Sequence, residues 1–315
     1  MKTLRLLSAG LVAAGLALPI DPAHAIPRTF VSGTGSDANP CTAASPCLTF
    51  QAAHIATDAG GEITCLDAGD FGGVTITKSI TIDCAGTLGG ASSGITVNAN
   101  LATVRLRNLT LNGLGTGTIG VSFTAANALF IESCTILGFN GGAAGQGIGV
   151  KFAPAGTISE LYVTDSWIGG NGRAADGGGI IIQPTGIGQA RVNIENSQIL
   201  DNTFGIFANG TGTSAASSVQ IRDTAVAGSV VHGISSFTSG TTTSITTDRT
   251  SSLLNGQAGI LAQGSGAFVL LANSTVMSNG TGLSAVGGGG IFSYQNNHLT
   301  GNVSDGAPTA VLTTK

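Results

Sequence analysis

Apolar and polar residues alternate along most of this 315-residue chain, in a pattern that returns about every 27 residues. Each repeat opens with a glycine and continues through two short stretches with apolar residues at every second position. It then turns at an Asn or Asp into a third short apolar stretch. Alternation of period two predicts β-strands. The leading glycines lie 23 to 30 residues apart, at Gly94, Gly120, Gly149, Gly179, Gly205, Gly233, Gly259 and Gly282.

The apolar positions of these stretches predict one continuous core. In the first strand of a repeat they form pairs such as Val150 and Phe152, and in the second strand pairs such as Leu161 and Val163. Strands this short cannot bury an apolar face alone, so each repeat needs its neighbours to complete the core. The sequence therefore predicts a solenoid with three strands per coil.

Two rows of polar residues accompany the strands. One row lies between the second and third strands, at Asn108, Asp165, Asn196, Asp223, Asn273 and Asn296. The other follows the third strand, at Asn171, Asn202, Asn255, Asn279 and Asn302. Asn and Asp tolerate left-handed backbone and bond to nearby main chain, so we expect both rows to form sharp corners. Because nearly every coil repeats them, we interpret both rows as structural.

These motifs resemble the right-handed parallel β-helix of the pectate-lyase-like fold, over residues 48–303. The stretch from Thr49 through Gly61-Glu62-Ile63 to Phe71 is also similar to the cap and first coil that open many members. The resemblance implies an all-β protein, a right-handed parallel β-helix with three strands per coil and about nine coils. Residues 49–56 have the spacing of an amphipathic helix, which we expect to serve as a short N-terminal capping helix over the open end of the core.

The first 25 residues have the pattern of a secretory signal peptide. Lys2 and Arg5 precede an apolar stretch over residues 6–18, and Ala23-His24-Ala25 fits a small-x-small cleavage site. The apolar stretch is shorter than the roughly 20 residues that a membrane-spanning helix needs. We therefore expect export, with the mature chain in the periplasm, outside the cell or on its surface, and without a membrane span.

Four segments follow from these patterns. We expect a signal peptide at 1–25, an extended segment with the capping helix at 26–61, the β-helix at 62–303 and a C-terminal tail at 304–315.

Four of the five cysteines lie in the first third of the chain, which in an exported protein predicts disulfides. We favour Cys41–Cys47, which closes a short loop, and Cys65–Cys84, which would join adjacent coils. Four cysteines allow three connectivities, so the other pairings stay open. The fifth, Cys134, occupies a position held by Ser or Thr in later repeats, and we expect a small buried side chain there rather than a nucleophile.

The low charge content of the chain argues against a nucleic-acid partner. Charged residues make up only 9% of the chain, its net charge is −4, and Lys and Arg form no run. This composition lacks the basic footprint of a nucleic-acid-binding protein. The histidines are scattered and no cysteine pair has metal-type spacing, so we expect neither a metal site nor a cofactor.

Enzymes of the resembled fold carry their site on the outward face of the first strand and the loops beside it. Here that row is expected at Thr96, Ser122, Lys151, Ile181, Phe207, Ser235, Leu261 and Ser284. The row contains no carboxylate, whereas calcium sites use several and glycoside hydrolysis usually uses a pair. We therefore expect a non-catalytic protein that engages a polysaccharide or a cell-surface glycan through this face.

The residues that we expect to contact the glycan are Lys151, Arg173, Asp176 and Phe207. Lys151 points outward from its strand, and the loop over 169–178 carries Arg173 and Asp176. Variable loops beside a rigid scaffold are where binding sites are commonly built.

Two alternatives stay open. In one, the chain is a divergent polysaccharide lyase or glycoside hydrolase that uses Lys151, Arg173 and Asp176. In the other, it is a structural or adhesin module that assembles through an outward apolar trio, Ile181, Phe207 and Leu261. The sequence does not predict an oligomeric state.

Overall fold

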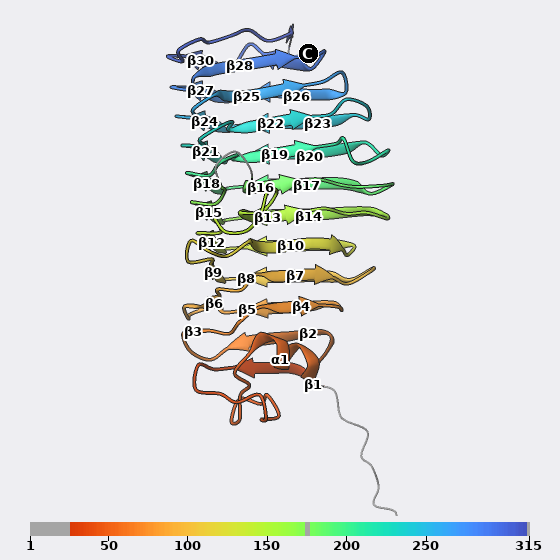
Figure 1. Ribbon diagram of the computed structural model, residues 1–315, viewed down its shortest axis with the longest axis vertical. Helices are drawn as coiled ribbons and strands as arrows, with labels where there is room; N and C mark the ends of the chain where they lie inside the picture. The colour runs from red at the N-terminus through yellow and green to blue at the C-terminus, as the bar shows by residue number, and fades with distance from the viewer. Residues whose placement is uncertain (1–25, 174–176, 314–315) are drawn as a thin grey trace, which may run out of the picture.

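A computed structural model describes residues 26–173 and 177–313, which form a rod of stacked coils (Figure 1). Each regular coil contributes one strand to each of three sheets, and neighbouring strands within a sheet are parallel. The three-strand coil expected from the repeat is confirmed. We name the sheets after the order of their strands in a coil.

The first-strand sheet has nine strands. They are β4 (Val74–Ile76), β7 (Ile95–Asn98), β10 (Ile119–Ala125), β13 (Ile148–Phe152), β16 (Gly178–Ile182), β19 (Ile206–Asn209), β22 (Ile234–Phe237), β25 (Ala258–Gln263) and β28 (Thr281–Val286).

The second-strand sheet has twelve strands and runs the full length of the rod. They are β1 (Ile26–Val31), β2 (Thr57–Cys65), β5 (Ile80–Asp83), β8 (Thr103–Arg107), β11 (Ala128–Glu132), β14 (Ile158–Thr164), β17 (Gln189–Glu195), β20 (Ser217–Arg222), β23 (Thr243–Asp248), β26 (Ala267–Ala272), β29 (Gly290–Tyr294) and β31 (Ala310–Leu312).

The third-strand sheet has ten short strands. They are β3 (Gly69–Asp70), β6 (Gly89–Ala91), β9 (Thr110–Asn112), β12 (Thr135–Leu137), β15 (Trp167–Gly169), β18 (Gln198–Leu200), β21 (Ala225–Ala227), β24 (Ser251–Leu253), β27 (Thr275–Met277) and β30 (His298–Thr300).

The core lies between the three sheets and follows the predicted alternation. Val150 and Phe152 of β13 are fully buried, as are Leu161 and Val163 of β14. Side chains also stack along the axis: the ring centroids of Phe123 and Phe152, in adjacent coils, are 4.4 Å apart. Each coil thus covers the core of the next, so no additional layer of helices or strands is needed to bury it.

The Asn row that follows the third strand is bonded from coil to coil, and its members are buried except for Asn302, which is partly exposed. Asn255 accepts the backbone N–H of Ser229 (3.0 Å) and donates from Nδ2 to Oδ1 of Asn279 (2.8 Å). The leading glycine packs directly against this row: a Cβ at Gly259 would lie only 2.6 Å from Nδ2 of Asn279. The structural interpretation of the row therefore also explains the leading glycines that face one of its Asn residues, Gly149, Gly179, Gly233, Gly259 and Gly282.

Ser229 interrupts the buried row. It occupies the place that Asn has in the coils on either side, and its hydroxyl is buried without a hydrogen-bond partner among the described residues. A shorter side chain here cannot reach the next coil as an amide does.

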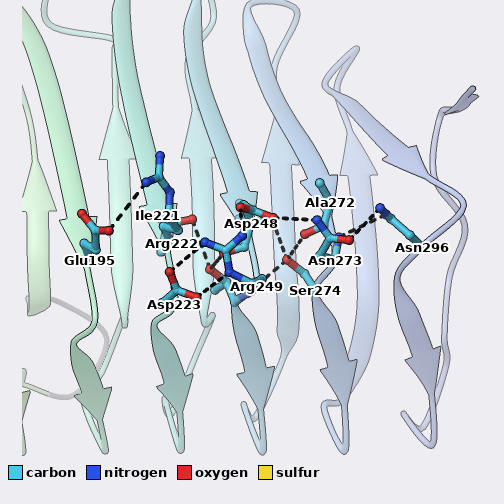
Figure 2. Close-up of polar contacts among 12 residues, drawn as sticks. Glu195, Ile221, Arg222, Asp223, Asp248, Arg249, Ala272, Asn273, Ser274 and Asn296 are labelled. Carbon is cyan, nitrogen blue, oxygen red and sulfur yellow. Dashed lines mark hydrogen bonds and ion pairs between the residues drawn. The ribbon is translucent and has the colours of Figure 1, made fainter. Parts of the chain in front are cut away.

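The row between the second and third strands forms the expected left-handed corner at each predicted position except Asn296, whose φ is not positive. Asn196 has φ +48° and donates from Nδ2 to Asp165 (2.5 Å). Figure 2 shows the same corner further along, where Arg249 takes an Asn position with φ +48° and binds both carboxylate oxygens of Asp223 (2.6 and 2.9 Å). These contacts link neighbouring coils along an exposed edge.

A short helix, α1 (Phe50–Ala56), precedes the first-strand sheet, with Thr49 as its N-cap. Its side chains take the place of a missing strand beside β4. Gln51 Oε1 accepts the backbone N–H of Thr75 and His54 Nε2 accepts that of Thr77, both at 3.0 Å. The helix therefore satisfies edge groups that would otherwise be unpaired.

His54 is buried by this arrangement and exposes only 3% of its surface. Burial, together with the charge of Lys78, lowers the pKa of His54 from 6.5 to about 4. The imidazole is thus neutral at physiological pH, as its acceptor role requires.

The N-terminal segment is more regular than expected, because β1 pairs in parallel with β2 and β2 already begins at Thr57. The tail expected at 304–315 likewise contains a strand, β31, which pairs with β29.

Both favoured disulfides, Cys41–Cys47 and Cys65–Cys84, are present. The loop that the first one closes covers the outer edge of β1: the N–H of Phe30 donates to the carbonyl of Cys41 (2.9 Å), and the N–H of Cys47 donates to the carbonyl of Phe30 (3.0 Å).

Candidate functional site

The outward row of the first-strand sheet is continuous along the rod. Its members pair directly from strand to strand, so their side chains stack in line. They are Thr96, Ser122, Lys151, Ile181, Phe207, Ser235, Leu261 and Ser284, as the sequence predicts. The chemistry of the row changes from one end to the other.

At the N-terminal end of the row, a groove of about 600 Å³ lies over β7 and β10. Thr96 and Ser122 form part of its floor, and the segment 113–119 borders it. Its side-chain polar groups are hydroxyls, at Ser92, Ser93, Thr96, Thr116, Thr118 and Ser122. We call this the hydroxyl groove.

A carboxylate lies beside the hydroxyl groove. Asp70 accepts hydrogen bonds from the hydroxyl of Ser92 (2.5 Å) and the backbone N–H of Gly72 (3.0 Å). Burial raises the pKa of Asp70, but these bonds together outweigh it and the pKa is lowered overall. Asp70 is therefore ionised and fixed in place, which suits it to orient Ser92.

Further along the row, four partly buried rings gather around β19 and β22. Phe204 stacks on Phe207 with 5.3 Å between ring centroids, and its ring lies 5.8 Å from that of His232. Phe237 lies 6.3 Å from Phe207. We call Phe204, Phe207, His232 and Phe237 the aromatic cluster.

The hydrogen bonding of His232 fixes its tautomer. Its Nδ1 accepts the backbone N–H of Ala258 at 3.1 Å, so the neutral ring carries its proton on Nε2. Burial lowers the pKa of His232, which keeps the ring neutral at physiological pH. The cluster thus contains one N–H donor.

Ser235 lies within the aromatic cluster, directly between Phe207 and Leu261 in the outward row. It is fully buried, and its hydroxyl has no hydrogen-bond partner in the described part of the chain. A buried hydroxyl without a partner costs free energy, so such groups are rare in folded proteins.

The apolar trio expected as a contact surface is not one. Ile181 and Leu261 point outward but expose only 6% and 7% of their surface, and only Phe207 of the three is partly exposed. Ile181 is flanked in the row by the long side chains of Lys151 and Phe207, which leave little of it open. The prediction of an exposed apolar patch was therefore wrong.

Of the charged residues predicted for the site, Lys151 belongs to the outward row and Arg173 lies in a neighbouring segment. Lys151 is partly buried between Ser122 and Ile181. Arg173 is exposed, in a segment that packs on the turn leading into β13: a Cβ at Gly147 would lie 3.2 Å from that of Arg173. Asp176 lies outside the described residues.

Several acidic side chains are instead paired on the second-strand sheet and its corner. Glu132 contacts Arg107 and also Arg105 (3.2 Å). The hydrogen bonds from Arg249 lower the pKa of Asp223 (Figure 2). These carboxylates are held by neighbouring coils, away from the outward row.

The buried thiol of Cys134 is less reactive than that of an exposed cysteine. Burial raises the pKa of Cys134 to about 12, so its thiol is not a nucleophile at neutral pH.

Within the ranges that the structure describes, no three His, Cys, Asp or Glu side chains are grouped to hold a metal ion. No helix in those ranges is long and apolar enough to cross a membrane.

Comparison with known proteins places the fold. No model of a protein family matches this chain, and no curated protein matches it in sequence. Among solved structures the chain is similar to pectate lyase Pel9A, with 14% identity and a TM-score of 0.50 over 87% of this chain and 78% of that one. The fold is a right-handed parallel β-helix of the pectate-lyase-like kind.

Two further structures are similar at lower scores. One is the GH136 lacto-N-biosidase from Eubacterium ramulus, at 14% identity, 85% and 56% coverage of the two chains and a TM-score of 0.45. The other is the Dettilon tailspike protein, at 13% identity, 80% and 58% coverage and a TM-score of 0.37. The chain spans somewhat more than half the length of each.

Sequence reasoning named Phe207 but missed the other three members of the aromatic cluster. Phe204 and His232 each stand immediately before a leading glycine, so they occupy the same place in adjacent repeats. Phe237 lies two residues after Ser235 and thus on the same outward face. Aligning the repeats one residue further upstream would have shown the first two together.

Proposed function

We propose that this protein binds a polysaccharide or a cell-surface glycan along its first-strand face and does not cleave it. The observation that carries the proposal is the unbroken outward row, which joins the hydroxyl groove to the aromatic cluster. A sugar polymer presents hydroxyls at its edges and C–H groups on its ring faces. A binding face for it therefore needs hydrogen-bonding groups and aromatic surface in one line.

The charges on the rod support binding rather than cleavage. Usual glycoside hydrolysis takes two carboxyl groups at a set separation. In the outward row, all of whose members are described, no carboxylate occurs. The carboxylates of Glu132 and Asp223 are engaged by arginines on another side of the rod.

The second candidate function is a divergent polysaccharide lyase or glycoside hydrolase. It is favoured by the placement of Arg173, whose segment packs on the turn before the strand that carries Lys151. Two similar structures are named as a pectate lyase and a lacto-N-biosidase. Under this proposal Lys151, Arg173 and Asp176 would act on the substrate.

One experiment separates the two. The protein beginning at Ile26 is run in native gels that contain single polysaccharides, and the same mixtures are assayed for new reducing ends and unsaturated products, with and without calcium. Retarded migration without new chain ends supports binding. New chain ends would overturn the non-catalytic proposal and make Lys151, Arg173 and Asp176 the first residues to replace. Neither retardation nor cleavage across the panel would overturn both.

We also propose that residues 1–25 direct export and are removed. The two disulfides fit an extracytoplasmic location, because disulfides persist in oxidising compartments. Sequencing of the exported protein should begin near Ile26. A start far from that residue, or retention in the cytoplasm, would contradict the proposal.

A further inference from the structure

We propose that the aromatic cluster, together with Ser235 beside Phe207 in the outward row, is a subsite for a neutral pyranose whose hydroxyls are equatorial. Such a sugar offers an apolar ring face to stack and hydroxyls at its rim to bond. The inference rests on the proposed function, because it names the sugar chemistry that the same face would take.

The rings of the cluster are partly exposed along the outward row, whereas the other partly exposed ring pairs, Phe130 with Tyr162 and Phe268 with Phe292, lie on the second-strand sheet. On the second-strand sheet, Phe130 lies between two partners: the Arg105 guanidinium is 3.8 Å from its centroid and the Tyr162 ring is 4.6 Å away. Phe207, in the row, and Phe204, next to it, pack on each other and remain partly exposed. A sugar face can therefore cover them, as aromatic side chains commonly bind apolar surface with a set geometry.

His232 supplies a donor at the edge of this surface. Its Nδ1 is occupied by the N–H of Ala258, so Nε2 carries the proton and can donate to a sugar hydroxyl. The ring of His232 packs against Phe204, which holds this N–H beside the stacking surface.

Ser235 is the second, independent sign of a ligand. Its hydroxyl is buried and has no partner in the described ranges. Phe207 and Leu261 flank it in the row. A sugar hydroxyl that enters as the Phe207 ring turns aside would supply the missing hydrogen bond, so binding would relieve a cost that the free protein carries.

The surroundings favour a neutral sugar over a uronate. The members of the row beside Ser235 are apolar, and Lys151 lies two strands away from Phe207. A carboxylate placed against these rings would lose water without gaining a charged partner.

The test measures binding of cellohexaose, a neutral sugar with equatorial hydroxyls, and of hexagalacturonate by isothermal titration calorimetry. Binding of cellohexaose in preference to hexagalacturonate is expected. Phe207→Leu keeps apolar volume but removes the ring, and should weaken cellohexaose binding about tenfold. Phe268→Leu is the matched control: Phe268 is also partly buried and packs on Phe292, 6.0 Å away, but on the second-strand sheet. It should leave binding unchanged.

Ser235→Ala gives a readout that a purely structural role would not produce. Removing an unpartnered buried hydroxyl should raise the melting temperature by about 2 °C or more, while cellohexaose affinity falls about fivefold. Unchanged affinity in both Phe207→Leu and Ser235→Ala would overturn the subsite.

The outcomes also separate this inference from the proposed function. If polysaccharides retard the protein in gels but cellohexaose does not bind, or hexagalacturonate binds more tightly, the subsite is wrong and glycan binding stands. If no glycan of either kind is bound, both are wrong.

Discussion

The buried Asn row and the outward row of the first-strand sheet run along the same rod and come from the same repeat, but they use polar groups in opposite ways. Asn255 and Asn279 bond to their counterparts in adjacent coils and are almost wholly buried. In the outward row, Ser235 has no partner in the described residues, and Lys151 and Phe207 stack on side chains unlike themselves.

The difference shows how a repeat separates structure from function. When the same amide recurs at each coil, donor and acceptor meet their own copies at the strand spacing, and no capacity is left for a ligand. When the residue type changes from coil to coil, the row cannot pair with itself, and its groups stay open to another molecule. Breaking either row should therefore affect a different property.

The largest effect is expected from Asn255→Leu. Leucine has the same branched shape but leaves the buried N–H of Ser229 without its acceptor and removes both bonds of Nδ2. Unfolding free energy should fall by about 3 kcal/mol or more, measured by urea denaturation. Lys151→Gln, in the outward row, is the control and should leave the midpoint unchanged. Equal losses in the two variants would contradict the distinction between the rows.

A decrease of similar size in the unfolding free energy is expected at low pH, because His54 is a buried hydrogen-bond acceptor at the N-terminal end of the rod. The pKa of His54 is about 4 in the folded protein and 6.5 when unfolded, so the unfolded state binds more protons between these values. Stability is full above pH 6.5 and falls as pH drops toward 4, by about 3 kcal/mol.

Melting temperatures across this pH window check the prediction for His54. His54→Gln keeps an acceptor for the N–H of Thr77 but does not titrate, and should flatten the profile above pH 4.5. A variant profile as steep as that of the original protein would assign the pH dependence to other groups.

Ser229→Asn should stabilise the protein, because it completes the buried row where it is interrupted. An amide would accept or donate toward the adjacent coils and remove an unpartnered hydroxyl, for a gain of about 1 kcal/mol. Differential scanning calorimetry would show a higher melting temperature. A decrease would mean that the close approach of Gly205, whose Cβ position is 3.0 Å from Oγ of Ser229, leaves no room for the amide.

The smallest effect is expected at the exposed corner. Glu195 and Arg222 form a surface ion pair at 3.6 Å between adjacent coils (Figure 2). Such pairs contribute little, so Glu195→Gln should change the unfolding free energy by less than about 0.5 kcal/mol. A loss that vanishes in 1 M NaCl would show instead that charge along this corner matters to the fold.

Much of the fold could be predicted from the sequence because the same alternation of buried and outward positions recurs in each repeat. The alternation at Val150 and Phe152 recurs in coil after coil, so a single irregular repeat does not obscure it. The ends were predicted less well. The strand β1 and the edge contacts of Gln51 and His54 occur once each, and no repetition marks them.

The candidate site was predicted in part, for a related reason. The outward row follows from period two alone, and Phe207 was found in this way. The burial of Ile181 was not, because it depends on the size of side chains one coil away. Phe204 and His232 sit in turns, where period-two reasoning does not apply. The ring of Phe204 packs on Phe207 of the same coil, and the ring of His232 reaches Phe204 only once the next coil is stacked.

Because the outward row has no register shift, any two of its members are separated by a whole number of strand spacings. Ser122, at the hydroxyl groove, and Phe207, at the aromatic cluster, are separated by three strand spacings, about 14 Å. A chain too short to reach both gains only one contact, whereas a longer one gains the second at a high effective concentration. Affinity should therefore rise steeply at one chain length, and the insertion of a whole coil between the two would move that threshold by one strand spacing.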